Sequence, residues 1–197
     1  MGYISSINAL SDELTPFSCR INTLHTHVYV EPDVRANVID QITLGSYVNV
    51  IDEAAGFSRI SSGGYVFSKH ITRSQRALEP DYVYTAGKLL GVPYLWGGRT
   101  PFGLDAPGLI QLSLDIADIE CMRDCDEQCE AFGQQLPTHW RDFLWRRGDL
   151  VFFSDHVGIM ADSEHIIHAE AHTTKVAVEP LVDLVLRGRE ITAIGRP

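Results

Sequence analysis

The hydrophobic and polar positions follow two different patterns along the chain. In the first third, short apolar or β-branched runs alternate with turn-forming residues such as Gly, Pro, Asp and Ser. Runs of this kind predict strands. We expect them at 28–30, 38–42, 47–51, 57–60 and 65–67. Many short strands separated by turns are typical of a small β-barrel. We therefore expect a lead-in over residues 1–20 and a small barrel over residues 21–76.

The second part starts with three helical patterns. Apolar residues on one face predict a helix over residues 80–90. Apolar residues around most of the circumference predict a buried helix over residues 105–119. A third helix is expected at 124–132, where Asp124 and Glu127 have the spacing of a capping box.

Five apolar runs follow the helices and predict strands. They lie at 150–153, 157–160, 165–169, 176–178 and 191–194. Helices followed by strands indicate an α+β domain over residues 77–197, with the helices packed on an antiparallel sheet. The composition agrees with such a domain, because 45% hydrophobic and 21% charged residues are ordinary for a soluble globular protein.

The net charge limits the classes of partner that we expect, and the lack of targeting signals indicates where the protein is located. The formal net charge of −10 disfavours nucleic acid and anionic membrane surfaces, which both need clustered Lys and Arg. No apolar run approaches the roughly 18 residues of a membrane span. Residues 1–14 lack the basic and apolar regions of a secretory signal. Three of the four cysteines share one short segment, which is not a disulfide framework. We therefore expect a cytoplasmic protein.

One stretch, residues 94–111, carries the candidate chemistry. It reads Tyr-Leu-Trp-Gly-Gly-Arg-Thr-Pro-Phe-Gly-Leu-Asp-Ala-Pro-Gly-Leu-Ile-Gln. Asp105 is a favourable N-cap for the buried helix, and Pro107 falls in the first turn, where its missing N–H costs little. Ala106 is therefore expected at the positive end of a buried helix. In a cysteine hydrolase this is the place of the nucleophile, because the helix dipole favours a thiolate.

The stretch resembles the nucleophile region of the NlpC-type cysteine endopeptidases, which act on bacterial cell-wall peptides. That family has Asp-Cys-Ser-Gly where this chain has Asp-Ala-Pro-Gly at 105–108. Four more segments resemble the family's motifs in the same order: 123–126, 147–153, 156–159 and 168–169. The resemblance implies a papain-like domain over residues 77–197. Residues 21–76 are similar to the bacterial SH3-type domain that often precedes it, which implies a small SH3-like β-barrel.

The resemblance also implies roles for individual residues. Ala106 occupies the nucleophile position, His156 the position of the catalytic base, and His168 the third, polar position that orients the base. The substrate-binding positions are Tyr94, Trp96, Asp105, Pro107 and Cys125. In the resembling enzymes, the tyrosine, the aspartate and a serine at the position of Pro107 bind the free amino end of the peptide. From the residues alone, Asp105 can equally be a helix cap without a further role.

Alanine at the nucleophile position predicts a catalytically inactive homologue of a γ-D-glutamyl-diaminopimelate endopeptidase. Such a protein would bind a cell-wall peptide with a free amino terminus, or another protein such as an active paralogue. The alternative is an active hydrolase, in which Ala106 is an engineered substitution or another nucleophile serves. An engineered inactivation leaves Pro107 unexplained, which favours a natural loss.

Neither the cysteine nor the histidine pattern predicts a metal site. Three cysteines recur at intervals of four residues and would line one face of the third helix: Cys121, Cys125 and Cys129. Structural zinc sites usually draw paired ligands from separate segments, so these cysteines are expected to be small packing residues. His165, His168 and His172 do not follow the period of two that would place them on one face of a strand. We expect no metal and no cofactor.

Overall fold

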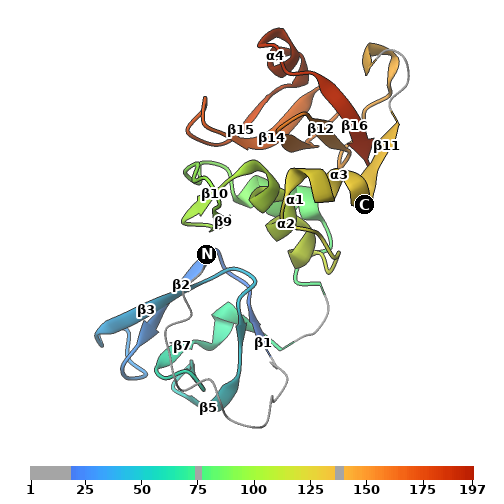
Figure 1. Cartoon of the computed structure of the whole chain (residues 1–197). Coiled ribbons are helices and arrows are strands. Elements are labelled where there is room, and N and C mark those ends of the chain that lie inside the picture. The colour runs from blue at the N-terminus through green and yellow to red at the C-terminus, as the bar shows by residue number, and fades with distance from the viewer. Residues whose placement is uncertain (1–18, 74–76, 136–139) are drawn as a thin grey trace.

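The computed structural model of the chain describes residues 19–73, 77–135 and 140–197. Two parts follow one another in the sequence (Figure 1). The N-terminal part consists mainly of strands, and the C-terminal part combines helices with a sheet. Among the described helices, none has the length and apolar character needed to cross a membrane. Most of the expected lead-in, residues 1–18, lies outside the described residues.

Short strands and one 3-10 helix make up the described N-terminal part: β1 (Cys19–Ile21), β2 (His25–Tyr29), β3 (Val38–Thr43), β4 (Tyr47–Val48), β5 (Val50–Ala54), β6 (Phe57–Ile60), β7 (Tyr65–Phe67), η1 (Ser68–His70) and β8 (Ile71–Thr72). One antiparallel sheet has the order β3-β2-β7-β6-β5, and a second has the order β4-β1-β8. Ile21, Ile60 and Val66 come from both sheets and share one buried core.

The strands expected at 38–42, 57–60 and 65–67 are confirmed. The strand expected at 28–30 begins earlier and ends at Tyr29, as β2, whereas β1 and β8 were not expected. The last two residues of the expected lead-in, Cys19 and Arg20, belong to β1. The strand expected at 47–51 is two strands, β4 and β5, which belong to different sheets. Between them, the carbonyl of Asn49 accepts the N–H of Ser61 at 2.9 Å, so the chain changes partner there. The described strands do not form a closed barrel.

The C-terminal part contains α1 (Tyr82–Lys88), β9 (Arg99–Thr100), β10 (Gly103–Leu104), α2 (Ala106–Ile116), α3 (Cys125–Phe132), β11 (Gly133–Gln135), η2 (Trp140–Asp142), β12 (Leu150–Phe153), β13 (Val157–Met160), β14 (His165–Glu170), β15 (Lys175–Pro180), α4 (Leu181–Leu186) and β16 (Ile191–Gly195). Six strands form an antiparallel sheet in the order β11-β16-β12-β13-β14-β15. The first three helices lie on one side of this sheet (Figure 1). The expected α+β architecture is therefore confirmed.

Helix α2 is the central element of this part because it is buried almost all round. Leu109 and Leu114 have no exposed surface, and the helix packs against β13 and β14. At its start, Oδ1 of Asp105 accepts the N–H of Gly108 at 2.8 Å, which is the expected N-cap. Position 108 also requires glycine, because a β-carbon there would lie 2.2 Å from the carbonyl oxygen of Gly98. The start of α2 is thus fixed against the loop that contains Gly98.

Several expected features of the C-terminal part were wrong. Helix α2 ends at Ile116 rather than at 119, because the backbone reverses at Asp118 with a φ of 63°. Asp124 precedes α3, but its side chain makes no capping hydrogen bond, so the capping box is absent. Cys121 lies before α3, so the three cysteines do not share a helical face. The short elements β9, β10, β11 and α4 were not expected at all.

Arg20 connects the two parts of the chain. It belongs to β1, yet only 2% of it is exposed. Its Nη1 donates to the carbonyl of Asp115 at 3.2 Å, and its Nη2 forms an ion pair with the carboxylate of the same residue. Its Nε donates to the carbonyl of Gly45 at 3.3 Å. Asp115 lies in the last turn of α2, so Arg20 anchors this end of the buried helix to the N-terminal part.

Arg20→Met should lower the free energy of unfolding by about 1–3 kcal/mol, because it leaves carbonyl acceptors in a buried contact without their donor. Urea denaturation followed by circular dichroism measures this change. Arg35→Met is the matched control, since Arg35 pairs with Asp33 at the surface and its loss should leave the urea midpoint unchanged. Equal midpoints for Arg20→Met and the wild type would contradict the anchoring role of Arg20.

Candidate functional site

A cleft of about 540 Å³ lies where the start of α2 faces the sheet. Most of the residues assigned to the site from the sequence line this cleft: Tyr94, Trp96, Asp105, Ala106, Pro107, Cys125 and His156. The remaining one, His168, is fully buried and lies directly behind His156. The structure therefore brings together every residue that the sequence assigned to the site.

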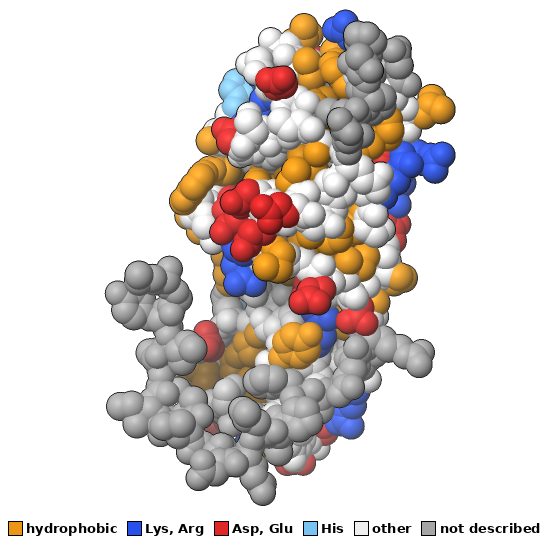
Figure 2. Space-filling model, turned by 45° about the vertical axis from the view of Figure 1, so that its right-hand side comes forward, with side chains coloured by type: hydrophobic (Ala, Val, Ile, Leu, Met, Phe, Trp, Pro, Cys, Tyr) orange, Lys and Arg blue, Asp and Glu red, His pale blue; other side chains and the backbone are white. Residues whose placement is uncertain are grey.

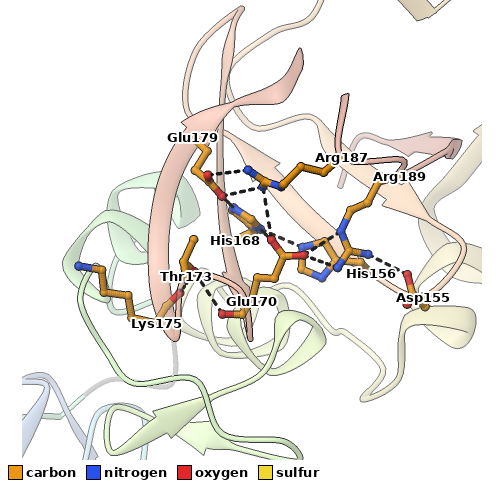
Figure 3. A network of polar contacts seen from close by, with 9 residues as sticks. All are labelled: Asp155, His156, His168, Glu170, Thr173, Lys175, Glu179, Arg187 and Arg189. Carbon is orange, nitrogen blue, oxygen red and sulfur yellow. Dashed lines mark hydrogen bonds and ion pairs between the residues drawn. The ribbon is translucent and has the colours of Figure 1, made fainter. Parts of the chain in front are cut away.

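Two histidines and a glutamate form a chain of hydrogen bonds behind the cleft (Figure 3). The Nε2 of His156 lies 2.9 Å from the Nδ1 of His168. The Nε2 of His168 lies 2.8 Å from the Oε2 of Glu179. Arg187 holds this carboxylate with two hydrogen bonds of 2.9 Å, one to each oxygen. His156 directly precedes β13, His168 lies on β14 and Glu179 on β15, so three neighbouring strands position the chain of groups.

Both histidines are neutral at physiological pH. Burial lowers the pKa of His156 to about 2, and the positive charge of Arg189 acts in the same direction. Burial also lowers the pKa of His168, although its hydrogen bond to Glu179 opposes this shift. A neutral imidazole has one donor nitrogen and one acceptor nitrogen. The charged residues Glu179 and Arg187 therefore decide which ring nitrogen of each histidine carries the proton.

Two arginines pair with the carboxylates around His168. Arg189 donates from Nε to Oε1 of Glu170 at 2.9 Å, and Nη2 of Arg187 lies 3.4 Å from Oε2 of the same residue. Ligand atoms of His168, Glu170 and Glu179 all lie within 4.8 Å of one another, which is close enough for a metal ion. Both carboxylates already have an arginine partner, however. The donor set therefore suits a salt-bridge network better than a cation site.

This charged network was missed in the sequence. Glu170 and Glu179 lie on strands that are otherwise largely apolar, and a charged residue on a buried strand usually has a partner. That was the one local signal available. The partners, Arg187 and Arg189, follow a helix that the sequence pattern did not predict. Arg187 and Arg189 lie too far along the chain from Glu170 for a local spacing rule to predict that they pair with it.

The carboxylate of Asp105 is fully engaged within the protein. Besides capping α2 through Oδ1, it accepts two further hydrogen bonds at Oδ2. One comes from the N–H of Gly97 at 2.8 Å and the other from Nη2 of Arg123 at 2.6 Å. Only 6% of Asp105 is exposed. The capping role expected from the sequence is therefore present, and its expected role in peptide binding stays a prediction. Arg123 joins the site as the partner of Asp105.

The other side of the cleft offers an exposed carboxylate and an exposed indole. The side chain of Asp124 is 71% exposed, and its nearest cationic atom is Nη1 of Arg123 at 3.9 Å. Trp96 is 85% exposed. Burial raises the pKa of Cys125 to about 11, and nearby carboxylates, Asp105 first among them, add to this shift. The thiol of Cys125 therefore stays protonated at neutral pH and is a weak nucleophile.

Acidic side chains gather beside apolar ones on the C-terminal part of the molecule (Figure 2). Helix α3 and its N-cap contribute exposed acidic residues: Asp124, Asp126, Glu127 and Glu130. A surface of this kind attracts cationic groups more readily than anionic ones. The negative net charge expected from composition is thus concentrated partly beside the cleft.

Comparison with known proteins agrees with this architecture. The chain is 27% identical over 188 residues to dipeptidyl-peptidase 6 of Lysinibacillus sphaericus, covering 85% of this chain and 68% of that protein. It is 26% identical over 198 residues to a gamma-D-glutamyl-L-lysine dipeptidyl-peptidase of Bacillus subtilis, covering 89% of this chain and 64% of that protein. The chain thus spans about two thirds of the length of these relatives.

The chain also resembles a solved structure, and half of it matches a known protein family. The fold resembles that of an NlpC/P60 family protein from Bacillus cereus, with a TM-score of 0.70 at 20% identity over 90% of this chain and 62% of the other. This likeness supports the papain-like architecture expected for the C-terminal part. Residues 91–189, half of the chain, match the NlpC/P60 family. With the motifs in order around one cleft and this match across them, the chain belongs to the NlpC/P60 family.

Proposed function

We propose that this chain is a catalytically inactive member of the NlpC/P60 family whose cleft binds a cell-wall peptide. The observation that carries the proposal is Ala106. It is the first residue of α2, it lines the cleft together with His156, and it stands where the family resemblance puts the nucleophilic cysteine. A methyl side chain cannot form the covalent intermediate through which a cysteine peptidase works.

The remainder of the cleft supports ligand binding. Its volume is in the range of small-molecule sites, and it offers the indole of Trp96 and the carboxylate of Asp124. One relative is named a gamma-D-glutamyl-L-lysine dipeptidyl-peptidase, which supports a γ-D-glutamyl peptide as the ligand here. Since Asp105 is engaged by Gly97, Gly108 and Arg123, Asp124 is the better candidate partner for the free amino end of such a peptide.

A second candidate function is the binding of another protein, such as an active paralogue. The loop before α2 exposes three large apolar side chains: Leu95, Trp96 and Phe102. Exposed apolar groups next to an open cleft favour a protein contact. The alternative of an active hydrolase has less support. Cys125 begins α3 rather than α2, and its raised pKa disfavours the thiolate that such an enzyme needs.

We also propose a domain type for the N-terminal part and a cellular location for the protein. We propose that residues 21–76 are an SH3-type module, which is supported by their short antiparallel strands. The two relatives match over 85% and 89% of this chain, so their similarity extends beyond the C-terminal part. The cysteines form no disulfide among the described residues, which include all four of them. Reduced thiols are typical of the cytoplasm, which is the location we propose.

The purified protein should not cleave L-Ala-γ-D-Glu-diaminopimelate. Loss of the nucleophile of a covalent hydrolase lowers turnover by about a million-fold, so chromatography should show no products above background, next to an active family member as positive control. Cleavage that survives Cys121→Ser, Cys125→Ser and Cys129→Ser together would show that another chemistry operates. Cleavage abolished by Cys125→Ser alone would show that the nucleophile has moved to α3.

Ala106→Cys should restore little activity by itself, whereas Ala106→Cys with Pro107→Ser should restore more. The proline lacks the backbone N–H and the hydroxyl that a serine would place at the start of α2. Polar contacts of this kind contribute about 1–3 kcal/mol each when their partners are otherwise unpaired, so the double variant should be about 5- to 150-fold faster. Pro107→Ser alone is the control and should be inactive. Equal rates for both cysteine variants would make Pro107 irrelevant.

Binding of the tripeptide should depend on its free amine and on Asp124. An exposed ion pair contributes about 0.2–1 kcal/mol, so Asp124→Asn and N-acetylation of the peptide should each weaken binding by up to about fivefold in calorimetry. Asp126→Asn is the matched control, because Asp126 is an exposed neighbour on α3 that does not line the cleft. Equal affinities of the free and acetylated peptides would exclude recognition of the amine. If neither peptide gives a heat of binding, the protein-binding function is the better supported of the two.

A further inference from the structure

The far end of the hydrogen-bonded chain behind the cleft is a fixed acceptor. Both oxygens of Glu179 accept hydrogen bonds from Arg187, which are charge-assisted and require a carboxylate. Its Oε2 also lies 2.8 Å from Nε2 of His168. Figure 3 shows the two side chains pointing toward each other from adjacent strands. A carboxylate oxygen and a bare imidazole nitrogen at this distance would repel each other, so Nε2 of His168 carries a proton.

The proton on Nε2 of His168 determines which of the other ring nitrogens of His168 and His156 carry protons. A neutral His168 that is protonated on Nε2 has a bare Nδ1, which is an acceptor. The Nε2 of His156, at 2.9 Å from that atom, must therefore be the donor. A neutral His156 then has its own Nδ1 bare. This nitrogen makes no hydrogen bond within the described residues, and His156 lines the cleft together with Ala106.

We infer that Glu179 is a positioning residue that sets the tautomer of His156 through His168, so that the cleft presents a hydrogen-bond acceptor at Nδ1 of His156. Only the part of this inference that concerns the ligand rests on the proposed binding function. A ligand group that lies between His156 and Ala106 has to be a donor: an amide N–H, a hydroxyl or an ammonium. A carboxylate oxygen there would face a lone pair.

The low pKa of His156 supports this role. Burial keeps its ring neutral, so the acceptor persists through the physiological range and does not turn into a donor by protonation. Arg187 contributes indirectly, because it keeps Glu179 ionised and lowers the pKa of that carboxyl group. The salt-bridge network that the sequence did not reveal thereby has a chemical effect in the cleft.

The tautomers can be measured directly by NMR on the full chain with ¹⁵N-labelled histidine. Long-range ¹H–¹⁵N correlations distinguish protonated from bare ring nitrogens, and the His156→Gln and His168→Gln variants assign the signals. In the wild type at pH 7, both rings should be protonated on Nε2 and bare on Nδ1. In Glu179→Leu, the acceptor is gone and Arg187 faces His168, so both rings should switch to the Nδ1-protonated form.

Glu170→Gln is the matched control for charge. Glu170 also pairs with Arg187, and its Oε2 lies 3.9 Å from Nδ1 of His168. It makes no hydrogen bond to either ring nitrogen of His168, so both tautomers should stay as in the wild type. A wild-type spectrum with a proton on Nδ1 of either ring would overturn the inference without any variant. Glu179→Leu spectra that match the wild type would also overturn it.

A titration with L-Ala-γ-D-Glu-diaminopimelate separates this inference from the proposed function. If the peptide binds, the ¹⁵N signal of Nδ1 in His156 should shift as that atom accepts a hydrogen bond. Binding in calorimetry without such a shift would overturn the part of the inference that concerns the ligand. If no binding is found, the proposed peptide function fails, whereas the tautomer spectra still decide the role of Glu179.

Discussion

Burial of helix α2 is the constraint on which the rest of the structure depends. Its apolar residues fill the space between the sheet and the other helices, so the helix cannot move without opening the core. Gly108 packs on the carbonyl of Gly98 at one end, and Arg20 holds Asp115 at the other. The position of Ala106 relative to the sheet follows from this fixed helix. The cleft is therefore a consequence of core packing and does not depend on a nucleophile being present.

Charges near the cleft are arranged in pairs because they are largely removed from water. Glu170 and Glu179 lie next to a fully buried His168, where an unpaired carboxylate would be costly. Arg187 and Arg189 compensate both of them. Burial is the main cause that keeps both histidines neutral, because it lowers their pKa values. The carboxylates oppose this shift at His168, and the positive charge of Arg187 offsets part of their effect.

If the chain is catalytically inactive, as we propose, it has no catalytic need for an oriented imidazole. His156 nevertheless keeps its hydrogen bond to His168, and the cleft beside it stays open. A binding module uses these features directly, because a preformed acceptor and an exposed indole reduce the ordering that binding requires. Pro107 fits the same view, since it is compatible with the first turn of a helix while it removes a donor that an enzyme would use.

The sequence by itself determined the types and order of most elements, the N-cap at Asp105 and the set of residues around Ala106. These features rest on local signals: hydrophobic period, turn residues and motif spacing. Only the tertiary structure decided that the run at 47–51 divides between two sheets, that Arg123 engages the carboxylate of Asp105, and that Glu179 pairs with His168. Each of these depends on groups that are distant in the chain and meet only through strand pairing and packing, for which a single sequence contains no local pattern.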